Sequence, residues 1–181
     1  REQLAHELRS ILKQDGITTI MVTHNQLEAF AMADIIGVMR NGKLRQWDTA
    51  FNLYHVPKTL DVADFIGEGV LISGEVINNM EVKTDVGIIK GRIPKNLEKG
   101  RKVRVLIRPD DILHDDDSEM TACVRNKVFR GAEFLYTLEM KNGLYIQSLV
   151  PSHHDHPLNE PIGIKLEIEH LVIFTDDEIS I

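Results

Sequence analysis

The sequence predicts two parts that follow one another along the chain: an α/β segment and then an all-β barrel module. In the first third, helical periodicities alternate with apolar runs, whereas the rest has short alternating runs separated by Gly, Pro and Asn. The charge changes at the same place, because residues 1–66 carry seven Lys and Arg against eight Asp and Glu, and the remainder carries fourteen against twenty. We place the boundary between Phe65 and Gly69 and predict domains at residues 1–67 and 68–181.

The composition excludes several classes of protein. A net charge of −7 disfavours a general nucleic-acid binder, because such proteins neutralise phosphates with clustered Lys and Arg. The lone Cys123 leaves no internal disulfide framework and favours a reducing compartment such as the cytoplasm. There is no run of eighteen or more apolar residues, so no segment is predicted to span a bilayer.

The first predicted element is a helix from Glu2 to Gln14. Asp15 and Gly16 end it. Its apolar residues recur at helical spacing, which predicts one face packed on a sheet: Leu4, Leu8, Ile11 and Leu12.

The stretch from Thr18 to Asp34 follows as a strand, a polar turn and a helix. The β-favouring apolar run Thr18–Val22 predicts a strand buried on both faces. Thr23 or Asn25 is a suitable N-cap for the helix. His24 is then expected at the carboxyl end of a buried strand, the edge of an open α/β sheet where ligands bind. The alternative is that His24 only caps the helix or bonds a nearby carbonyl.

Further elements complete the first part. Ile35–Met39 predicts a strand, and Asn41-Gly42 is a strong hairpin signal, so Lys43–Asp48 should return antiparallel. Pro57 separates two short predicted helices, because it fits inside neither of them: Thr49–His55 and Thr59–Ile66.

A set of residues between Val22 and Gly67 forms a recognisable pattern of residue types and spacings: Val22, Thr23, His24, Gln26, Glu28, Ala29, Ala33, Asp34, Met39, Gly42, Gln46, Thr49, Leu53, Tyr54, Pro57, Phe65, Ile66 and Gly67. This pattern resembles the carboxyl-terminal end of the ATPase subunit of bacterial ABC importers, in the group that serves ferric iron, sugars, polyamines and sulfate. Asn25, Asp48 and Ala50 depart from the usual Asp, Gly and Pro, which puts the local turn before Thr49 in question.

The resemblance implies a role for His24 as the switch histidine, whose imidazole contacts the γ-phosphate of ATP in the intact subunit. An imidazole N–H aimed at developing phosphoryl charge is a reasonable electrostatic stabiliser. The implied cofactors of the intact subunit are ATP and Mg²⁺. The implied partners are a second copy of the subunit and membrane-spanning permease subunits, with no nucleic acid. The implied location is cytoplasmic and peripheral, at the inner face of the plasma membrane.

Other parts of a phosphoryl-transfer site are missing from the sequence. The glycine-rich loop with its Lys, the Mg²⁺-binding acid and the water-positioning base precede Arg1 in the family. Gly37–Lys43 fits the spacing of a phosphate loop, but Leu44 replaces the hydroxyl residue that binds Mg²⁺. We therefore expect a piece of a longer subunit that has no nucleotide cofactor site of its own and does not hydrolyse ATP alone.

The second part predicts eight short strands, which would close into one small barrel or a pair. Asn142-Gly143 marks a hairpin, and Gly131 marks a tight approach between strands. The strands are Val70–Ile77, Gly87–Ile93, Arg101–Ile107, Met120–Phe129, Glu133–Met140, Leu144–Val150, Ile162–Ile168 and Leu171–Phe174.

The segment VRVLIRPDDI, in which Arg108, Pro109 and Asp110 carry the match, resembles a signature of the regulatory domain that follows these ATPases. That domain is the transport-associated oligomer-binding (TOBE) domain, built from OB-like barrels. The predicted fold class is therefore an α/β carboxyl-terminal remnant of an ABC nucleotide-binding domain followed by an all-β OB-like (TOBE) barrel domain.

Three polar clusters in this module are candidate ligand sites. Arg108 with Asp110 and Asp111 would suit a regulatory anion or inducer, although pairing of Arg108 with a carboxylate is the simpler explanation. The run His153, His154, Asp155 and His156 has metal-ligand side chains, but adjacent residues of an extended loop point in different directions. We predict a solvated turn and no metal there. The acidic run Asp115–Asp117 lacks the alternate spacing of a calcium loop and predicts an exposed loop.

The sequence thus predicts the carboxyl-terminal part of an ABC importer ATPase subunit with a regulatory and dimerising domain. The alternative is a stand-alone barrel that senses a small ligand or an oxyanion, or only dimerises. Ferric iron is the first expectation for the cargo, because the barrel matches the sugar-importer branch only loosely.

Overall fold

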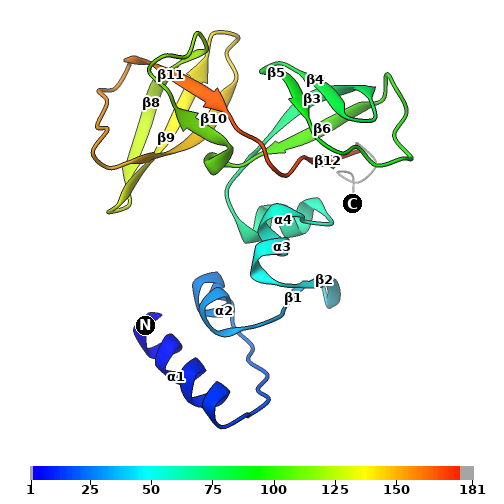
Figure 1. Cartoon of the computed structure of the whole chain (residues 1–181), viewed down its shortest axis with the longest axis vertical. Coiled ribbons are helices and arrows are strands. Elements are labelled where there is room, and N and C mark those ends of the chain that lie inside the picture. The colour runs from blue at the N-terminus through cyan, green and yellow to red at the C-terminus, as the bar shows by residue number, and fades with distance from the viewer. Residues whose placement is uncertain (1, 176–181) are drawn as a thin grey trace. The chain divides into compact units, whose positions relative to one another are not determined.

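The computed structural model describes residues 2–175, and the chain divides between Ile66 and Gly67 into two units (Figure 1). The amino-terminal unit contains four helices and one hairpin among its described residues. Its elements are α1 (Glu2–Gln14), α2 (Gln26–Met32), β1 (Ile36–Arg40), β2 (Lys43–Asp48), α3 (Ala50–His55) and α4 (Leu60–Ile66). The predicted helices and the hairpin are confirmed. None of the helices within residues 2–175 is both long and apolar enough to cross a membrane.

The predicted strand at Thr18–Val22 is wrong. The chain between α1 and α2 has no regular structure, and the side chains of Ile20 and Val22 are 92% and 96% exposed. A strand exists only where a neighbouring strand takes up its backbone hydrogen bonds. No described strand pairs with this run, so its β-favouring sequence remains unpaired.

The apolar face of α1 is also not covered as predicted. Leu4, Leu8 and Ile11 are exposed, and no described sheet packs on them. Polar contacts instead attach the helix to the segment after α2. Arg9 and Lys13 form ion pairs with Asp34 at 2.8 and 2.6 Å, and together they hold the pKa of that carboxyl below its ordinary value.

The β1–β2 hairpin and the short helices have a small core of their own. Asn41 and Gly42 both have positive φ, 52° and 72°, as a two-residue hairpin turn of the expected kind requires. The buried Gln46 accepts a hydrogen bond from the Lys58 N–H and donates one to the Val56 carbonyl, which fixes the turn around Pro57. The core residues of this unit come from the hairpin, α3 and α4: Val38, Leu53, Val62 and Ile66.

The turn before Thr49 forms in spite of the unusual residue at position 48. The Asp48 carboxylate accepts hydrogen bonds from the Thr49 N–H and the Asn52 amide, and Thr49 caps α3 through the Asn52 N–H. These bonds lower the pKa of Asp48, with the Asn52 contact as the largest cause. An acidic side chain at a helix start therefore replaces the expected glycine.

The carboxyl-terminal unit holds two five-stranded antiparallel sheets in its described residues. In one sheet the order is β12-β6-β3-β4-β5, and in the other it is β10-β9-β8-β11-β7. The strands are β3 (Val70–Asn78), β4 (Glu81–Thr84), β5 (Gly87–Lys90), β6 (Lys102–Ile107), β7 (Ile112–His114), β8 (Thr121–Phe129), β9 (Glu133–Met140), β10 (Tyr145–Pro151), β11 (Pro161–Leu166) and β12 (Val172–Phe174). The eight predicted strands are all present, with shifted ends, whereas the short strands β4 and β7 were not predicted.

The second sheet curves into a nearly closed barrel. Its two outer strands, β7 and β10, approach each other, and the buried Ser148 hydroxyl of β10 donates to the Ile112 carbonyl of β7 at 2.6 Å. A continuous apolar core that includes Ile72, Val105 and Tyr136 fills the unit and joins both sheets. The all-β part of the fold prediction is thus confirmed. We refer below to the β7–β10 junction as the barrel seam.

Two crossings connect the sheets. β6 of the first sheet leads into β7 of the second through a 3-10 turn at Pro109–Asp111, and the chain returns to the first sheet between β11 and β12. The crossings are bonded to each other, because the Glu167 N–H donates to the Asp111 carbonyl at 2.9 Å.

We expect Gly163→Ala to destabilise the carboxyl-terminal unit by ~2–3 kcal/mol, because a Cβ there would lie 2.1 Å from the Asp115 carbonyl oxygen. Gly163 lets β11 approach the chain that leaves β7. Urea unfolding followed by far-UV circular dichroism measures the effect. Gly143→Asn is the matched control, since φ is 82° there, no atom lies within 4 Å of a new Cβ, and Asn tolerates this conformation. Equal stability of the two variants would contradict the steric argument.

Candidate functional site

His24 lies at a bend just before α2, and its side chain is exposed. The residues on either side of it supply the hydrogen bonds that start the helix. The Asn25 carboxamide oxygen accepts from the N–H groups of Leu27 and Glu28, and the Thr23 hydroxyl donates to the Glu28 carboxylate at 3.0 Å. The bend is therefore fixed from both sides while the imidazole faces outward. Asn25, one of the two predicted caps, is the cap of α2.

Arg108 is almost fully buried, with 5% of its surface exposed. Its guanidinium donates to the carbonyl oxygens of Gly67 and Glu68 at 2.7 and 2.9 Å, and its backbone N–H donates to the Asp111 carboxylate at 2.7 Å. Pro109 is buried at the first position of the 3-10 turn. The arginine thus ties the sheet crossing to the beginning of its unit. Asp110 is exposed beside it, and a role of Arg108 and Asp110 in binding a regulatory ligand stays a prediction.

The surroundings of the Asp111 carboxyl group disfavour its charged form. Burial raises its pKa to about 6, with the nearby Asp110 charge adding to the rise and the Arg108 N–H opposing it. A partly buried carboxylate that accepts a hydrogen bond still loses hydration, and here this loss is larger than the stabilisation by the hydrogen bond and by the Arg108 charge.

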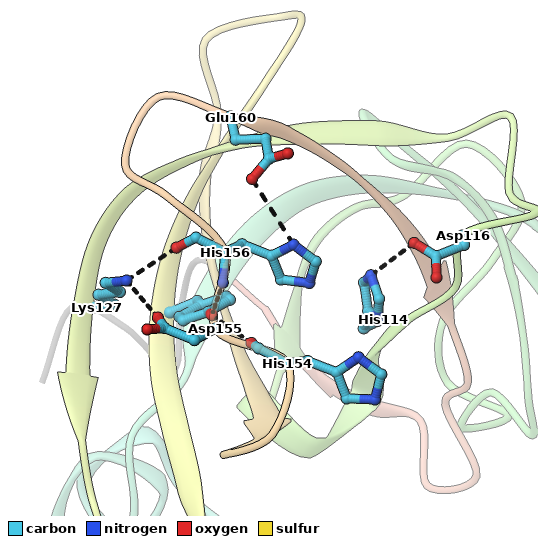
Figure 2. Close-up of polar contacts among 8 residues, drawn as sticks. His114, Asp116, Lys127, His154, Asp155, His156 and Glu160 are labelled. Atoms are coloured by element: carbon cyan, nitrogen blue, oxygen red, sulfur yellow. Dashed lines mark hydrogen bonds and ion pairs between the residues drawn. The ribbon is translucent and has the colours of Figure 1, made fainter.

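Three histidine side chains meet at the barrel seam: His114 at the end of β7, and His154 and His156 in the loop between β10 and β11. One ring nitrogen from each lies within 4.8 Å of the others. The ring centroids are separated by 4.6 Å for His114 and His156, 5.0 Å for His114 and His154, and 6.3 Å for His154 and His156. Figure 2 shows the three rings gathered around one region. We call this group the histidine triad.

The backbone of the β10–β11 loop explains why two members of the predicted histidine run join the triad and the others do not. His154 and His156 are half-buried, whereas His153 and Asp155 are exposed. Alternate residues of an extended segment point to the same side. Asp155 instead pairs with Lys127, which also donates to the His156 carbonyl at 2.9 Å (Figure 2).

Tyr136 of β9 holds this loop through two hydrogen bonds of its hydroxyl group. Its fully buried phenol donates to the His154 carbonyl at 2.7 Å and accepts from the His156 N–H at 3.0 Å. The two hydrogen bonds tie the backbone on both sides of Asp155 to β9. The spacing of the two histidine side chains is thereby determined by a core residue.

Two carboxylates lie beside the histidine triad. Asp116 Oδ1 lies 3.1 Å from His114 Nε2, and Glu160 Oε2 lies 3.9 Å from His156 Nδ1 (Figure 2). Desolvation by burial lowers the pKa of His156, the neighbouring His114 lowers it further, and Glu160 opposes the shift. The acidic run was predicted to form an exposed loop. Asp116 and Asp117 are exposed, and the Asp115 side chain accepts from the Asp117 N–H within this loop at 3.1 Å.

His114 is the member of the triad that the sequence did not indicate. It lies forty residues before His154, in a three-residue strand with no alternating pattern of its own. Its place follows from the pairing of β7 with β11, in which His114 stands opposite Ile164. A histidine after the apolar pair Ile112-Leu113, followed by an acidic run, was the one available signal.

Comparison with known proteins agrees with this architecture. Residues 105–174 match the TOBE domain family. The chain is 30% identical over 194 aligned residues to the spermidine/putrescine import ATP-binding protein PotA of Escherichia coli K12, and equally so to that of Shigella flexneri. The alignments cover 98% of this chain and 51% of each relative, so the chain spans about half the length of the curated relatives it matches. A crystal structure of the cytoplasmic molybdate-binding protein ModG, with molybdate bound, superposes with a TM-score of 0.50 at 13% identity over 59% of this chain and 95% of ModG, which shows a shared fold.

The fold and the matched residues define a protein that contains a TOBE domain of the OB-like class. The chain is homologous to the carboxyl-terminal part of the ATP-binding subunits of ABC importers. The family resemblance inferred from the sequence is therefore confirmed.

We predict that Asp111→Asn becomes progressively more stable than the parent chain as the pH rises from about 4 to 7, by ~1–2 kcal/mol after allowance for solvent screening. The raised pKa means that the folded state holds a proton that the unfolded chain has released. The stability that protonation of Asp111 contributes to the folded state is complete below pH 3.8 and is lost as the pH rises through about 6. Urea unfolding at several pH values measures it. Asp117→Asn, in the exposed loop, controls for the loss of a carboxyl group, and a stability difference that does not change with pH would refute the assignment.

We expect Tyr136→Phe to lower the free energy of unfolding by ~1–2 kcal/mol, because two hydrogen bonds of a buried hydroxyl are lost. The loop should loosen locally, so the His156 amide should exchange its proton faster than in the parent. Hydrogen exchange followed by NMR measures this directly. Tyr145→Phe removes an exposed hydroxyl of β10 and should leave the His156 amide unchanged. Unchanged exchange in Tyr136→Phe would mean that the phenol does not hold the loop.

Proposed function

We propose that the chain forms the carboxyl-terminal part of the ATP-hydrolysing subunit of an ABC importer. In this proposal residues 1–67 complete the nucleotide-binding domain and residues 68–181 form a regulatory and dimerising domain. The observation that carries the proposal is the identity of 30% over 98% of the chain to import ATP-binding proteins, which extends through both units.

His24 is proposed to contact the γ-phosphate of ATP in the intact subunit. Two observations support this role. The imidazole is exposed at a fixed bend, and the hydrogen bonds that cap α2 come from Asn25, so the alternative in which His24 serves as the cap loses its basis. An imidazole N–H can stabilise charge that develops on a transferring phosphoryl group.

The exposed apolar surface of the amino-terminal unit supports its assignment to a larger domain. Ile20 and Val22 are exposed in an extended segment, and the apolar face of α1 is open. In the intact subunit we propose that Thr18–Val22 joins the sheet of the nucleotide-binding domain and that α1 covers it. His24 would then stand at the carboxyl end of a strand, where ligands of α/β sheets bind.

ATP with Mg²⁺ is the cofactor proposed for the intact subunit. Mg²⁺ bridges phosphate oxygens and neutralises their charge during transfer. Of the residues described here, His24 is the one we assign to the nucleotide, which fits a γ-phosphate contact but not a complete cofactor site. We accordingly expect no hydrolysis by the 181-residue chain alone.

The partners proposed are a second copy of the subunit and the membrane-spanning permease subunits, at the cytoplasmic face of the membrane. For the cargo, the relatives are named as spermidine/putrescine importers, which favours a polyamine over the ferric iron expected from the sequence. An oxyanion-sensing barrel remains the second candidate, but the likeness to ModG concerns the fold and adds no ligand-binding residue.

We predict that His24→Ala in the full-length subunit reduces kcat for ATP hydrolysis by about 100-fold or more, the usual effect of removing a group that stabilises transferring charge. Affinity for ATP should change by no more than a few fold. Phosphate release and nucleotide binding are measured on the assembled transporter.

His6→Ala provides the control, since it removes an exposed imidazole from α1. Near-normal turnover by His24→Ala, or an equal loss in both variants, would end the switch-histidine assignment.

A further inference from the structure

We propose that His114, His154 and His156 bind one divalent transition-metal ion of the Zn²⁺ class across the barrel seam. Imidazole nitrogens are common ligands of such ions, and three of them lie within 4.8 Å of one another. Among the residues that the structure describes, this is the one such group of histidine, cysteine or acidic side chains. The site is independent of the nucleotide chemistry proposed above, because all its ligands belong to the carboxyl-terminal unit.

The distances suit a site that closes on its ion. Zn–N bonds of about 2.0–2.1 Å in tetrahedral geometry place ligand nitrogens about 3.4 Å apart. The present separations of up to 4.8 Å therefore have to shorten by at most about 1.4 Å. His154 and His156 stand on a loop, and rotation of their side chains supplies such a movement. His114 stands on a paired strand and provides the fixed side of the site.

One ring nitrogen in each of two triad members, His114 and His156, is available for coordination. Nε2 of His156 is buried and has no hydrogen-bond partner within residues 2–175, while Nδ1 of the same ring faces the Glu160 carboxylate at 3.9 Å. A carboxylate that accepts a hydrogen bond from one ring N–H fixes the tautomer in which the other nitrogen offers its lone pair to a metal, as in many metal sites. Nε2 of His114 is equally buried, and the 3.1 Å approach of Asp116 to it is not aligned as a hydrogen bond.

The ligand set selects the class of ion. Three imidazoles favour Zn²⁺, Co²⁺, Ni²⁺ or Cu²⁺ over Mg²⁺ and Ca²⁺, which prefer oxygen ligands. A fourth position would be filled by water or by Asp116, whose side chain is 82% exposed and free to turn. The ion would therefore be held by three nitrogens and one oxygen.

The position of the triad would let a bound ion connect the two outer strands of the barrel sheet. β7 and β10 are the outer strands of the barrel sheet, and the Ser148–Ile112 hydrogen bond links them without a ladder between them. His114 is the last residue of β7, and the loop with His154 and His156 follows β10. A metal ion would join the two edges of the barrel and oppose its opening. Binding to the folded state alone raises the stability by mass action.

The test is titration of the metal-free 181-residue chain with ZnCl₂ by isothermal calorimetry. We expect one Zn²⁺ per chain and a rise in Tm of about 5 °C or more at saturating metal. Co²⁺ should give the intense visible absorption bands of a tetrahedral nitrogen-ligated ion. His114→Asn and His156→Asn should each weaken Zn²⁺ binding by about 100-fold.

His153→Ala is the matched control, because His153 is exposed in the same loop and lies outside the triad. It should bind Zn²⁺ as the parent does. Circular dichroism confirms that each variant folds, and His156→Asn keeps the test valid should His114→Asn unfold. Unchanged affinity in His156→Asn, an equal loss in His153→Ala, or no binding by the parent at micromolar Zn²⁺ would overturn the proposal. Retained binding by a folded His114→Asn would likewise overturn it, since it would reduce the site to chelation by the loop alone.

Discussion

The turn at Arg108–Asp111 is the constraint on which the carboxyl-terminal unit depends. The chain leaves one sheet at Ile107 and enters the other at Ile112, so four residues must change its direction. The Asp111 carboxylate closes the turn on the Arg108 N–H, and the Arg108 guanidinium holds the carbonyls of Gly67 and Glu68. The Asp111 carbonyl accepts from the Glu167 N–H at the return crossing. One short segment thus determines where both crossings lie.

This arrangement has a cost in electrostatic free energy. The buried Arg108 and the partly buried Asp111 lose hydration, and the raised pKa of Asp111 is consistent with incomplete compensation of its carboxylate. An uncharged turn would avoid this cost. The buried guanidinium, however, reaches two carbonyls at once through its Nη1 nitrogen. The charged residues therefore fix the geometry of the turn, and the turn leads directly into β7, which ends at His114.

The sequence predicted elements whose determinants are local. The Asn41-Gly42 hairpin, the cap at Asn25 and the alternating strands of the barrel all depend on neighbours within a few residues. The strand at Thr18–Val22 was mispredicted, because a strand needs a partner and no local pattern supplies one. The short strands β4 and β7 were missed for the opposite reason, since three or four residues carry too little periodicity.

The histidine triad shows the same division between local and non-local information. The alternation of an extended loop could have placed His154 and His156 on one side, but the loop alone gives two imidazoles and no third. His114 joins them only through the pairing of β7 with β11, and that pairing depends on a glycine small enough to let the strands approach. The sequence therefore indicated the candidate metal ligands that lie on one loop, but it did not indicate that a third histidine joins them.

The two units differ in how complete their hydrophobic cores are. Because of this difference, the proposed site of one unit can be studied alone and that of the other cannot. The carboxyl-terminal unit fills its interior from both sheets, and the triad, its supporting tyrosine and its surrounding carboxylates all lie within that unit. The amino-terminal unit has a core of four buried residues and leaves apolar side chains of α1 and of the Ile20–Val22 segment exposed. His24 accordingly depends on packing that the described residues do not supply. A ligand at the barrel seam needs no such completion, so its binding can be measured without nucleotide and without the rest of a transporter.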